Sequence, residues 1–574
     1  MPTQLTVIPP SRRAHPSEDV AELRHDALKG CRILFINMPL RESAQPNTPP
    51  QGPGLMAARL RQYGASPTIV DLNAYRMRDE TARAQGLPNG RHLTLAETRN
   101  LIEAHIGKHG EPDVIALSGM ITTLRWQENV AKMCRGIVPD AFIVSGGGLS
   151  TEVKLPLLHW IPELDAVAHS EGDDIILLLV NDVTRARRNA GVHWRPRMAE
   201  SRYYEGQIDG RALFMYGGDR PENLDNLPFA AWDLLDEDVL GNKVLEWYIQ
   251  TPVWGLAANN SSATPFSMKR SLTTVSSRGC PYACSFCYRG AQGERNYGMR
   301  SAENLRKEAE WLVKEYGVDF IGFPDDNFAV DRRRIVKLPE AFRELGIRWG
   351  THTRLDEADD RLVPMAESGC IYIGFGAESA SAHVLEEMDK GGFILRPRGA
   401  RENQLVTING FQFPETMVNG IRKCREVGIH SNCTWIMAYP GEALDDLKTS
   451  VGFILWQLEE VTRGLVSDTP EYENAVASIN QRMFVATAYP GTAMFKHPKV
   501  RGPLHEHFGI NFDKHGEPVP DEAYRSYILE LDDATKVLHG SDDSPLNFGE
   551  MPTDQFLEAR EYVDKGQIGK ILDM

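Results

Sequence analysis

The fold of this 574-residue chain is decided by the stretch SLTTVSSRGCPYACSFCYRG, residues 271–290. A β-branched segment at 273–275 predicts a short strand, and Cys280, Cys284 and Cys287 follow it. Closely spaced thiolates are typical ligands of zinc or of an iron–sulfur cluster. A four-cysteine zinc site needs a second cysteine pair, which does not follow, although a distant histidine would complete another kind of zinc site. Three cysteines leave one iron of a 4Fe–4S cluster open to a further ligand.

The segment from this loop to residue 492 alternates apolar strand patterns with helical patterns. Strands are predicted at 318–328, 348–356, 370–379, 431–442 and 482–492. Between the first strands, Leu305, Ala309 and Leu312 form the apolar stripe of a predicted helix at 302–316. This repetition predicts a partial barrel, whose functional groups lie at the C-terminal ends of the strands.

The Cys-x3-Cys-x-aromatic-Cys spacing resembles the signature of radical S-adenosylmethionine (SAM) enzymes, and the later segments occur in the order found in that family. The resemblance implies a partial (β/α)6 TIM-type barrel in which Cys280, Cys284 and Cys287 bind a 4Fe–4S cluster. The open iron of the cluster then binds the amino and carboxylate groups of SAM.

The same resemblance assigns contacts to SAM. It places the aromatic Phe286 near the adenine. The segment at 374–379 resembles a strand end that helps to hold SAM, which makes Gly376, Glu378 and Ser379 candidate contacts. Glu378 is expected to accept a hydrogen bond from the ribose or from the amino group.

Other charged residues leave two interpretations open. Asp325, Asp326 and Arg354 lie at predicted strand ends, where they either contact SAM or form a salt-bridged rim of the barrel. The insertion at 392–414 departs from the family pattern, and its three arginines either receive an anionic substrate group or belong to a solvated loop.

Alternating strands and helices also cover residues 31–185. The predicted strands are 31–39, 66–73, 112–120, 139–148 and 164–173. This pattern predicts a Rossmann-like, doubly wound parallel sheet with its ligand site at the carboxyl ends of the strands. Small residues gather at those ends, where they either make the tight turns of an ordinary domain or let the backbone approach a bulky ligand.

This region resembles the cobalamin-binding domain that precedes many radical SAM barrels. The matching pieces are 53–55, 146–148, 165–167 and 171–173. The Asp-x-His-x-x-Gly signature is absent, so no histidine is expected below the cobalt, and the loop at 120–125 is expected to line that face. The expected cobalamin contacts are Ser118, Met120, Thr122, Gly146, Gly147, Gly148, Glu171 and Gly172.

The chain is therefore predicted to be an α/β protein in which a small α-rich C-terminal region follows the two cofactor domains. The expected boundaries are an N-terminal arm at 1–30, a cobalamin-binding domain at 31–185, a linker at 186–270, the barrel at 271–492 and a C-terminal capping region at 493–574.

Composition excludes some partners. The formal net charge is −16 and no basic face is evident, which disfavours a nucleic-acid partner. No apolar run is long enough for a membrane span. Five of the eight cysteines are scattered singly among apolar or helical neighbours, as expected for buried thiols, and the clustered three indicate a metal site in a reducing cytoplasm.

The two resemblances together imply a cobalamin-dependent radical SAM methyltransferase. Such an enzyme receives electrons from a reductant such as flavodoxin or ferredoxin and transfers the methyl group of methylcobalamin to an unactivated carbon of a small-molecule or natural-product substrate. Three alternatives stay open: a cobalamin-dependent cyclase or rearrangement enzyme, an iron–sulfur electron-transfer protein, and a tRNA-modifying enzyme, which would bring a basic appendage. The sequence shows no evident general base or nucleophile, and the substrate is not readable from it.

Overall fold

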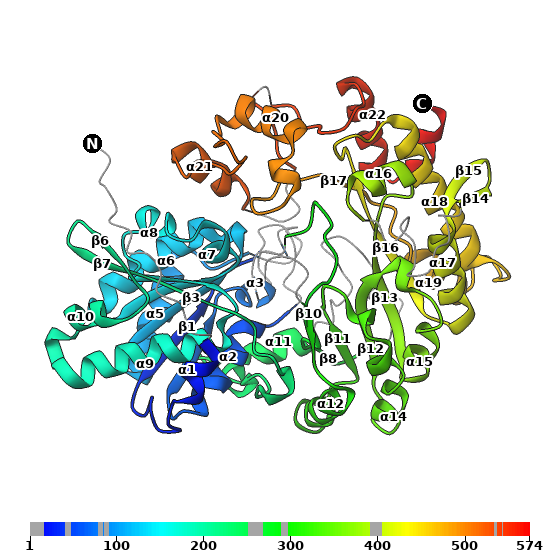
Figure 1. Cartoon of the computed structure of the whole chain (residues 1–574). Helices are drawn as coiled ribbons and strands as arrows, with labels where there is room; N and C mark the ends of the chain where they lie inside the picture. Colours follow the sequence, from blue (N-terminus) through cyan, green and yellow to red (C-terminus); the bar gives the residue numbers. More distant parts are fainter. Residues whose placement is uncertain are drawn as a thin grey trace. The chain divides into compact units, whose positions relative to one another are not determined.

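The computed structural model describes residues 16–40, 48–78, 84, 91–250, 268–288, 297–390, 405–532, 537–541 and 543–574 (Figure 1). The chain divides into two compact units. Unit 1 comprises Met1–Tyr248, Gly290–Gly293 and Pro520–Lys536, and unit 2 comprises Ile249–Arg289, Glu294–Val519 and Val537–Met574. Residues 1–15 of the predicted N-terminal arm and the three arginines of the 392–414 insertion lie outside the described residues.

Unit 1 is built on a seven-stranded sheet in the order β2-β1-β3-β4-β5-β7-β6. All neighbouring strands are parallel except the β6–β7 hairpin. The strands are β1 (Arg32–Asn37), β2 (Ser66–Asp71), β3 (Val114–Gly119), β4 (Phe142–Gly147), β5 (Ala166–Ser170), β6 (Tyr204–Ile208) and β7 (Arg211–Gly218). The predicted doubly wound sheet is confirmed, and its central strands are buried because helices cover both faces.

Four long helices make those two layers. α2 (Gln51–Arg61) packs with α9 (Gly172–Ala190), and α5 (Leu95–His109) packs with α6 (Leu124–Ile137) (Figure 1). A capping box at Thr94 starts α5. The shorter helices of this unit are α1 (Pro16–Ala21), α3 (Tyr75–Arg78), α7 (Gly148–Val153), α8 (Leu157–Trp160), α10 (Trp194–Arg197) and α11 (Val244–Gln250).

The segment that the sequence predicted as a linker, 186–270, differs in the structure. Its first part forms β6 and β7, which extend the sheet. Its next part is held by side chains: Trp232 is fully buried, and a Cβ atom placed on Gly54 would lie 3.1 Å from its ring. Arg61 also makes two 2.9 Å hydrogen bonds to Asp233. These few anchors have no regular spacing, which is why no periodicity predicted them.

The C-terminal region also contributes to unit 1. Helix α21 (Glu522–Glu530) packs on α6, and the ring of its Tyr524 lies 6.1 Å from that of Trp160 at the end of α8. Its Arg525 forms a 2.5 Å ion pair with Glu128. Part of the predicted capping region is therefore a component of the Rossmann-like unit.

Unit 2 contains a six-stranded, all-parallel sheet in the order β17-β16-β13-β12-β11-β8, which curls into a half-barrel. Its strands are β8 (Ser271–Thr273), β11 (Phe320–Phe323), β12 (Arg348–Arg354), β13 (Cys370–Glu378), β16 (His430–Met437) and β17 (Phe484–Val485). The partial barrel predicted from the sequence is confirmed. The short β9 (Ser277–Gly279) pairs with β10 (Tyr297–Met299) next to the cysteines.

Helices alternate with these strands, as the apolar periodicity predicted. They are α12 (Ala302–Tyr316), α13 (Arg332–Ile335), α14 (Leu338–Phe342), α15 (Leu362–Glu367), α16 (Ala382–Glu387), α17 (Glu415–Val427), α18 (Leu444–Thr462), α19 (Pro470–Ala477), α20 (Pro498–Phe508) and α22 (Thr553–Asp564). The described end of the 392–414 insertion forms the hairpin β14 (Leu405–Ile408) and β15 (Phe411–Pro414). Among the described helices, none combines the length and apolarity that crossing a membrane requires.

Asp165, just before β5, joins β4 to the helices α6 and α10, and its removal should destabilise unit 1. Its carboxylate is buried and accepts bonds from Arg135 (2.8 Å), Arg195 (2.6 Å) and the amide of Ile143 (2.8 Å). We expect Asp165→Ala to lower the free energy of unfolding by about 2 kcal/mol, because it strands two guanidinium groups. Urea unfolding followed by circular dichroism measures this.

The matched control removes an exposed ion pair of the same unit. Arg197→Ala breaks the surface pair with Glu200, whose side chains are 60% and 70% exposed, and should change stability by less than about 0.5 kcal/mol. Equal effects of the two substitutions would contradict the role given to Asp165.

Candidate functional site

The three clustered cysteines lie in a loop that follows β9. Cys284 is buried, while Cys280 and Cys287 are half-buried, and none of them forms a disulfide. Burial raises the pKa of the Cys280 thiol, and it raises the pKa of the Cys287 thiol to about 12. The thiols therefore become thiolates only when another positive charge, such as iron, takes the place of the proton.

The donor set fits a cluster better than a single ion. Within the described part of the chain, no three His, Cys, Asp or Glu side chains converge on one point where an ion would sit. Ligands of zinc must converge in this way, whereas the cysteines of a 4Fe–4S cluster each bind a different iron. Cys280, Cys284 and Cys287, on one short loop, match the second requirement.

Asp325 fixes the strand that leads into the cysteine loop. Its buried carboxylate accepts hydrogen bonds from the amide of Ser276 at 2.8 Å, from the hydroxyl of Ser277 at 2.6 Å and from the hydroxyl of Ser276. Arg334 donates to the carbonyl oxygen of Ser276 at 3.1 Å. Of the two interpretations of Asp325 left open by the sequence, these bonds favour the structural one.

Ser285 ties the middle of the loop to three other segments. Its amide donates to the carbonyl of Met388 at 2.9 Å, and its carbonyl accepts from the amide of Met494 at 2.8 Å. Its hydroxyl lies 2.6 Å from the hydroxyl of Tyr439. Loop residues between the cysteines are thus positioned by segments that follow β13, β16 and β17.

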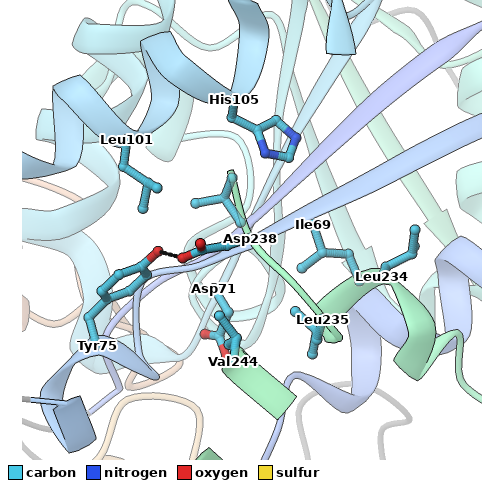
Figure 2. Close-up of a pocket in the computed structure, with 10 residues that line it drawn as sticks. Ile69, Asp71, Tyr75, Leu101, His105, Leu234, Leu235, Asp238 and Val244 are labelled. Carbon is cyan, nitrogen blue, oxygen red and sulfur yellow. Dashed lines mark hydrogen bonds between the residues drawn. The ribbon is translucent and has the colours of Figure 1, made fainter. Parts of the chain in front are cut away.

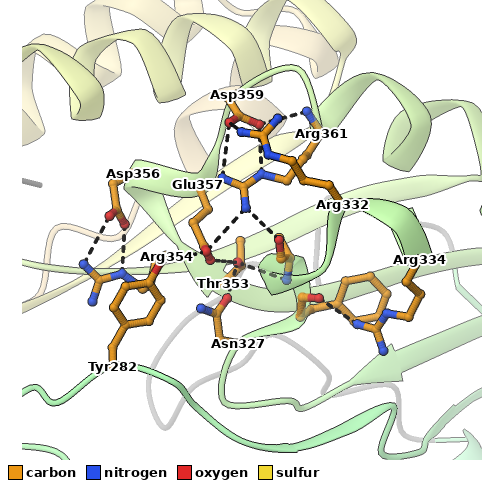
Figure 3. Close-up of polar contacts among 12 residues, drawn as sticks. Tyr282, Asn327, Arg332, Arg334, Thr353, Arg354, Asp356, Glu357, Asp359 and Arg361 are labelled. Atoms are coloured by element: carbon orange, nitrogen blue, oxygen red, sulfur yellow. Dashed lines mark hydrogen bonds and ion pairs between the residues drawn. The ribbon is translucent and has the colours of Figure 1, made fainter. Parts of the chain in front are cut away.

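Arg354, at the end of β12, contacts the cysteine loop directly. Its Nη1 donates to the Sγ of Cys284 at 3.4 Å, and its guanidinium lies 4.0 Å from the ring centre of Tyr282. Asp356 accepts from its Nε at 2.9 Å and from its Nη2 at 3.2 Å, as Figure 3 shows. Burial lowers the pKa of Arg354, but the charges of Asp356 and Cys284 outweigh it and the pKa is raised, so the group stays cationic.

A wider network of charges continues from Tyr282 across this end of the barrel (Figure 3). The Tyr282 hydroxyl donates to Glu357 at 3.0 Å, and Glu357 pairs with Arg361 at 3.3 Å. Arg361 in turn bonds Asp359 at 2.9 Å. A salt-bridged rim, one of the two arrangements expected for the strand ends, is therefore present here.

Glu378 ends β13 in an unusual backbone conformation. Its φ is +67°, and the pairing of β13 with β16 shifts register between Gly376 and Glu378. Non-glycine residues in this region of φ are strained and tend to occur at functional sites. A Cβ atom on Gly376 would lie 2.6 Å from the Oε1 of Glu378, so only glycine leaves room for this carboxylate.

The Glu378 carboxylate meets a buried lysine. The Nζ of Lys390 lies 3.5 Å from the Oε1 of Glu378 and 5.5 Å from the ring centre of Phe286. The hydroxyl of Thr434 donates to the Oε2 of Glu378 at 3.4 Å. Burial raises the pKa of Glu378, and Lys390 and Thr434 oppose this shift. The structure thus brings Phe286, Gly376 and Glu378 together, as the sequence predicted, and adds Lys390.

The remaining predicted SAM contacts lie differently. Asp326 is exposed, and its charge helps to raise the pKa values of Cys280 and Cys287, which places it near the loop. Ser379 is fully buried, and its hydroxyl lies 3.1 Å from that of Ser450 on α18. Ser379 therefore packs against a neighbouring helix.

The predicted cobalamin contacts gather at the carboxyl edge of the unit 1 sheet. Ser118 is at the end of β3, Gly146 to Gly148 end β4 and start α7, and Glu171 and Gly172 start α9. Met120 is 54% exposed there, and Thr122 donates to the carbonyl of Leu40 at 3.1 Å.

Glycines form much of this edge. A Cβ atom on Gly147, whose φ is +90°, would lie 2.4 Å from the carbonyl oxygen of Gly119, and one on Gly172 would lie 2.8 Å from the sulfur of Met56. The protein's own backbone packing therefore requires glycine at 147, while the neighbour of Gly172 is the flexible side chain of Met56. The nearby His169 packs across β7, since a Cβ atom on Gly217 would lie 2.1 Å from its Nε2.

Figure 2 shows a separate small pocket of unit 1, lined by residues of β2, α5 and the segment 234–244. The hydroxyl of Tyr75 donates to Asp238 in it. Burial raises the pKa of Asp71 to about 6, although Asn37 and Tyr248 each donate to it at 2.8 Å. These contacts anchor the 234–248 segment to the sheet, and we assign them a structural role.

Comparison with known proteins agrees with this geometry. Residues 274–454 match the model of the radical SAM superfamily. An uncharacterized methyltransferase of Pyrococcus horikoshii is 23% identical over 69% of this chain and 71% of its own length. The cobalamin-dependent radical SAM methyltransferase TokK of Streptomyces tokunonensis is 26% identical over 56% of this chain and 46% of its own. An anaerobic magnesium-protoporphyrin IX monomethyl ester cyclase of Rubrivivax gelatinosus is 26% identical over 54% and 51%.

Solved structures share the fold. OxsB, a cobalamin-dependent SAM radical enzyme with aqua-cobalamin and SAM bound, superposes with a TM-score of 0.58, at 15% identity over 88% of this chain and 66% of its own. The radical SAM methyltransferase TsrM of Kitasatospora setae, with tryptophan and a SAM analogue bound, has a TM-score of 0.53 at 14% identity over 93% and 98%. The chain contains a radical SAM domain, and a Rossmann-like domain precedes it in the sequence. In sequence it is similar to radical SAM methyltransferases, one of them cobalamin-dependent, at 23% to 26% identity.

Sequence reasoning missed Tyr282, Lys390 and Glu442. Glu442 is fully buried beyond β16: its Oε2 accepts from the amide of Ala438 at 2.5 Å, while its Oε1 has no hydrogen-bond partner among the described residues. One signal was available, because the Ala-Tyr-Pro-Gly turn before Glu442 recurs at 488–491 after the next strand.

Glu442 should make stability depend on pH. Burial raises its pKa from 4.5 to about 8, so the folded chain binds the proton more tightly than the unfolded chain does. The free energy of unfolding should therefore fall as pH rises from about 5 to about 8. Glu442→Gln should remove a contribution on the order of 3 kcal/mol to this fall, as measured by urea unfolding at pH 5 and pH 9. The control is the exposed Glu367→Gln, which should keep the wild-type profile, and an unchanged profile in Glu442→Gln would contradict the assignment.

Proposed function

We propose that this chain is a cobalamin-dependent radical SAM methyltransferase that methylates an unactivated carbon of a small molecule. The observation that carries the proposal is the combination on one chain of a three-cysteine loop in a half-barrel and a Rossmann-like unit with a glycine edge. When bound, the cluster and SAM supply a carbon-centred radical, and cobalamin supplies a methyl group.

The residues of unit 2 have distinct roles in this proposal. Cys280, Cys284 and Cys287 hold three irons and leave the fourth open. Glu378 is a hydrogen-bond acceptor for the ribose hydroxyls or the amino N–H of SAM, and Lys390 is a donor for its ribose or carboxylate oxygens. They lie 3.5 Å apart and would hold these groups of SAM from neighbouring positions.

Three further predicted residues complete the SAM site. Phe286 offers its ring to the adenine, while Gly376 keeps the space beside Glu378 open. Asp326, exposed beside the cysteine loop, remains a candidate contact. Ser379 and Arg354 act on other protein groups and reach SAM only indirectly.

The glycine edge of unit 1 is the proposed cobalamin site. When bound, the corrin would lie against this glycine-rich edge, where the Met120 side chain is exposed. The contacts proposed there are Ser118, Met120, Thr122, Gly146, Gly147, Gly148, Glu171 and Gly172. The reductant is a flavodoxin or ferredoxin, the substrate is of natural-product or metabolite type, and the thiols require a reducing compartment such as the cytoplasm.

A second candidate function is cyclisation or rearrangement without methyl transfer. The observation that favours it is the similarity to the Rubrivivax gelatinosus cyclase, of which this chain spans about half. Both functions use the same cofactors, so the products of SAM distinguish them.

The cysteine loop should carry all the iron. Anaerobically reconstituted chain should hold about four irons, and Cys280, Cys284 and Cys287 changed together to Ala should hold none and release no 5′-deoxyadenosine from SAM under reduction. Cys370→Ala, a buried thiol elsewhere in the barrel, is the control and should keep both. SAM cleavage by the triple variant would disprove the assignment.

Methyl transfer should give a fixed stoichiometry. With reductant, cobalamin and SAM carrying a deuterated methyl group, a metabolite extract should yield a new compound that contains the label on carbon. Each turnover should release one 5′-deoxyadenosine and one S-adenosylhomocysteine, because the radical and the methyl group come from different SAM molecules. Mass spectrometry checks all three. Substrate consumption with 5′-deoxyadenosine but no S-adenosylhomocysteine would favour the cyclase function.

A further inference from the structure

The buried guanidinium of Arg354 is joined to one of the cluster cysteines. Its Nη1 lies 3.4 Å from the Sγ of Cys284, with the side chain only 6% exposed. Cys284 is also the most buried of the three cysteines. A charged N–H group therefore donates to a cluster ligand in a setting from which water is largely excluded.

The guanidinium is held on every side. Asp356, itself 5% exposed, accepts from Nε and Nη2 at 2.9 and 3.2 Å. The ring of Tyr282 lies against its face at 4.0 Å (Figure 3). Its Nη2 is 3.4 Å from the carbonyl oxygen of Lys390. With its donors engaged by protein, Arg354 is not placed to receive SAM, which is the role the sequence suggested for it.

The two charges of this pair act on the cysteine in opposite directions. A cation that donates to a cluster sulfur stabilises the added electron of the reduced state and so raises the reduction potential. A carboxylate opposes this effect, and both act strongly because burial lowers the effective dielectric. Arg354 lies between Cys284 and Asp356, so the cation is the nearer charge.

We infer that Arg354 and Asp356 form a buried charge pair that sets the reduction potential of the cluster, with Arg354 raising it and Asp356 limiting the rise. The inference rests on the proposed function, because it requires the cluster to bind to Cys284. Arg354 is then a positioning and tuning residue that acts through the cysteine.

The test is a redox titration of anaerobically reconstituted full-length chain without SAM, followed by the electron paramagnetic resonance signal of the reduced cluster. Arg354→Gln should lower the midpoint potential and Asp356→Asn should raise it. Each should change the reduction equilibrium by about tenfold or more, which corresponds to ~59 mV for one electron. Shifts of opposite sign are the signature, since a loss of packing would not produce them.

The matched control is Arg361→Gln, which also breaks buried ion pairs at this end of the barrel, with Asp359 and Glu357, but among the described residues forms no hydrogen bond to a cysteine sulfur. Its potential should equal that of the wild type. If Arg354→Gln does not load iron, the other two variants test the inference. It is overturned if Asp356→Asn does not raise the midpoint potential, or if Arg354→Lys lowers the reduction equilibrium by tenfold. Shifts of equal sign in the two main variants overturn it as well. Wild-type chain that binds no iron would instead refute the proposed function.

Discussion

Hydrogen bonds from the strand ends of the half-barrel to the cysteine loop are the constraint on which the site depends. Asp325 holds Ser276 and Ser277 at the start of the loop, and segments after three other strands hold Ser285 in its middle. A free loop would lose much conformational entropy on binding a cluster. These bonds order residues beside and between the cysteines, which lowers the entropy that the loop loses when a cluster binds.

Several buried polar groups and one strained residue around the loop reduce the stability of the fold. Glu378 adopts a left-handed backbone conformation, Glu442 is buried with its pKa raised, and Arg354 is buried beside a thiol. Each would destabilise an ordinary core. The parallel sheet and its helices supply enough apolar burial to carry them, and the carboxyl ends of the strands are where such groups gather.

Much of this was readable from the sequence. Strand–helix alternation predicted both sheets, and the cysteine spacing located the loop, because these patterns report local geometry. Within the predicted linker 186–270, β6 and β7 were not foreseen, since β7 gains its stability from pairing with β5 and β6 from pairing with β7. Lys390 and the bond from Arg354 to Cys284 depend on distant segments meeting, which spacing along the chain does not encode. Gly147 shows the opposite difficulty: its own packing against Gly119 requires glycine, so its presence alone did not separate a tight turn from a ligand site.

The chemistry of the site is consistent with the way its charges are used. Around the cysteine loop, three groups of ionic side chains are engaged with one another: Arg354 with Asp356, Arg361 with Glu357 and Asp359, and Lys390 with Glu378. A general base needs an acceptor free to take a proton from substrate, and these carboxylates are instead held in ion pairs. Radical chemistry makes no such demand, because the cofactors perform the bond cleavage and the protein binds, orients and shields them. Because they are paired with one another, most residues of the charged rim have a structural role. Among the described residues of this rim, only the Arg354–Asp356 pair contacts a cysteine sulfur, through which it can influence the reduction potential of the cluster.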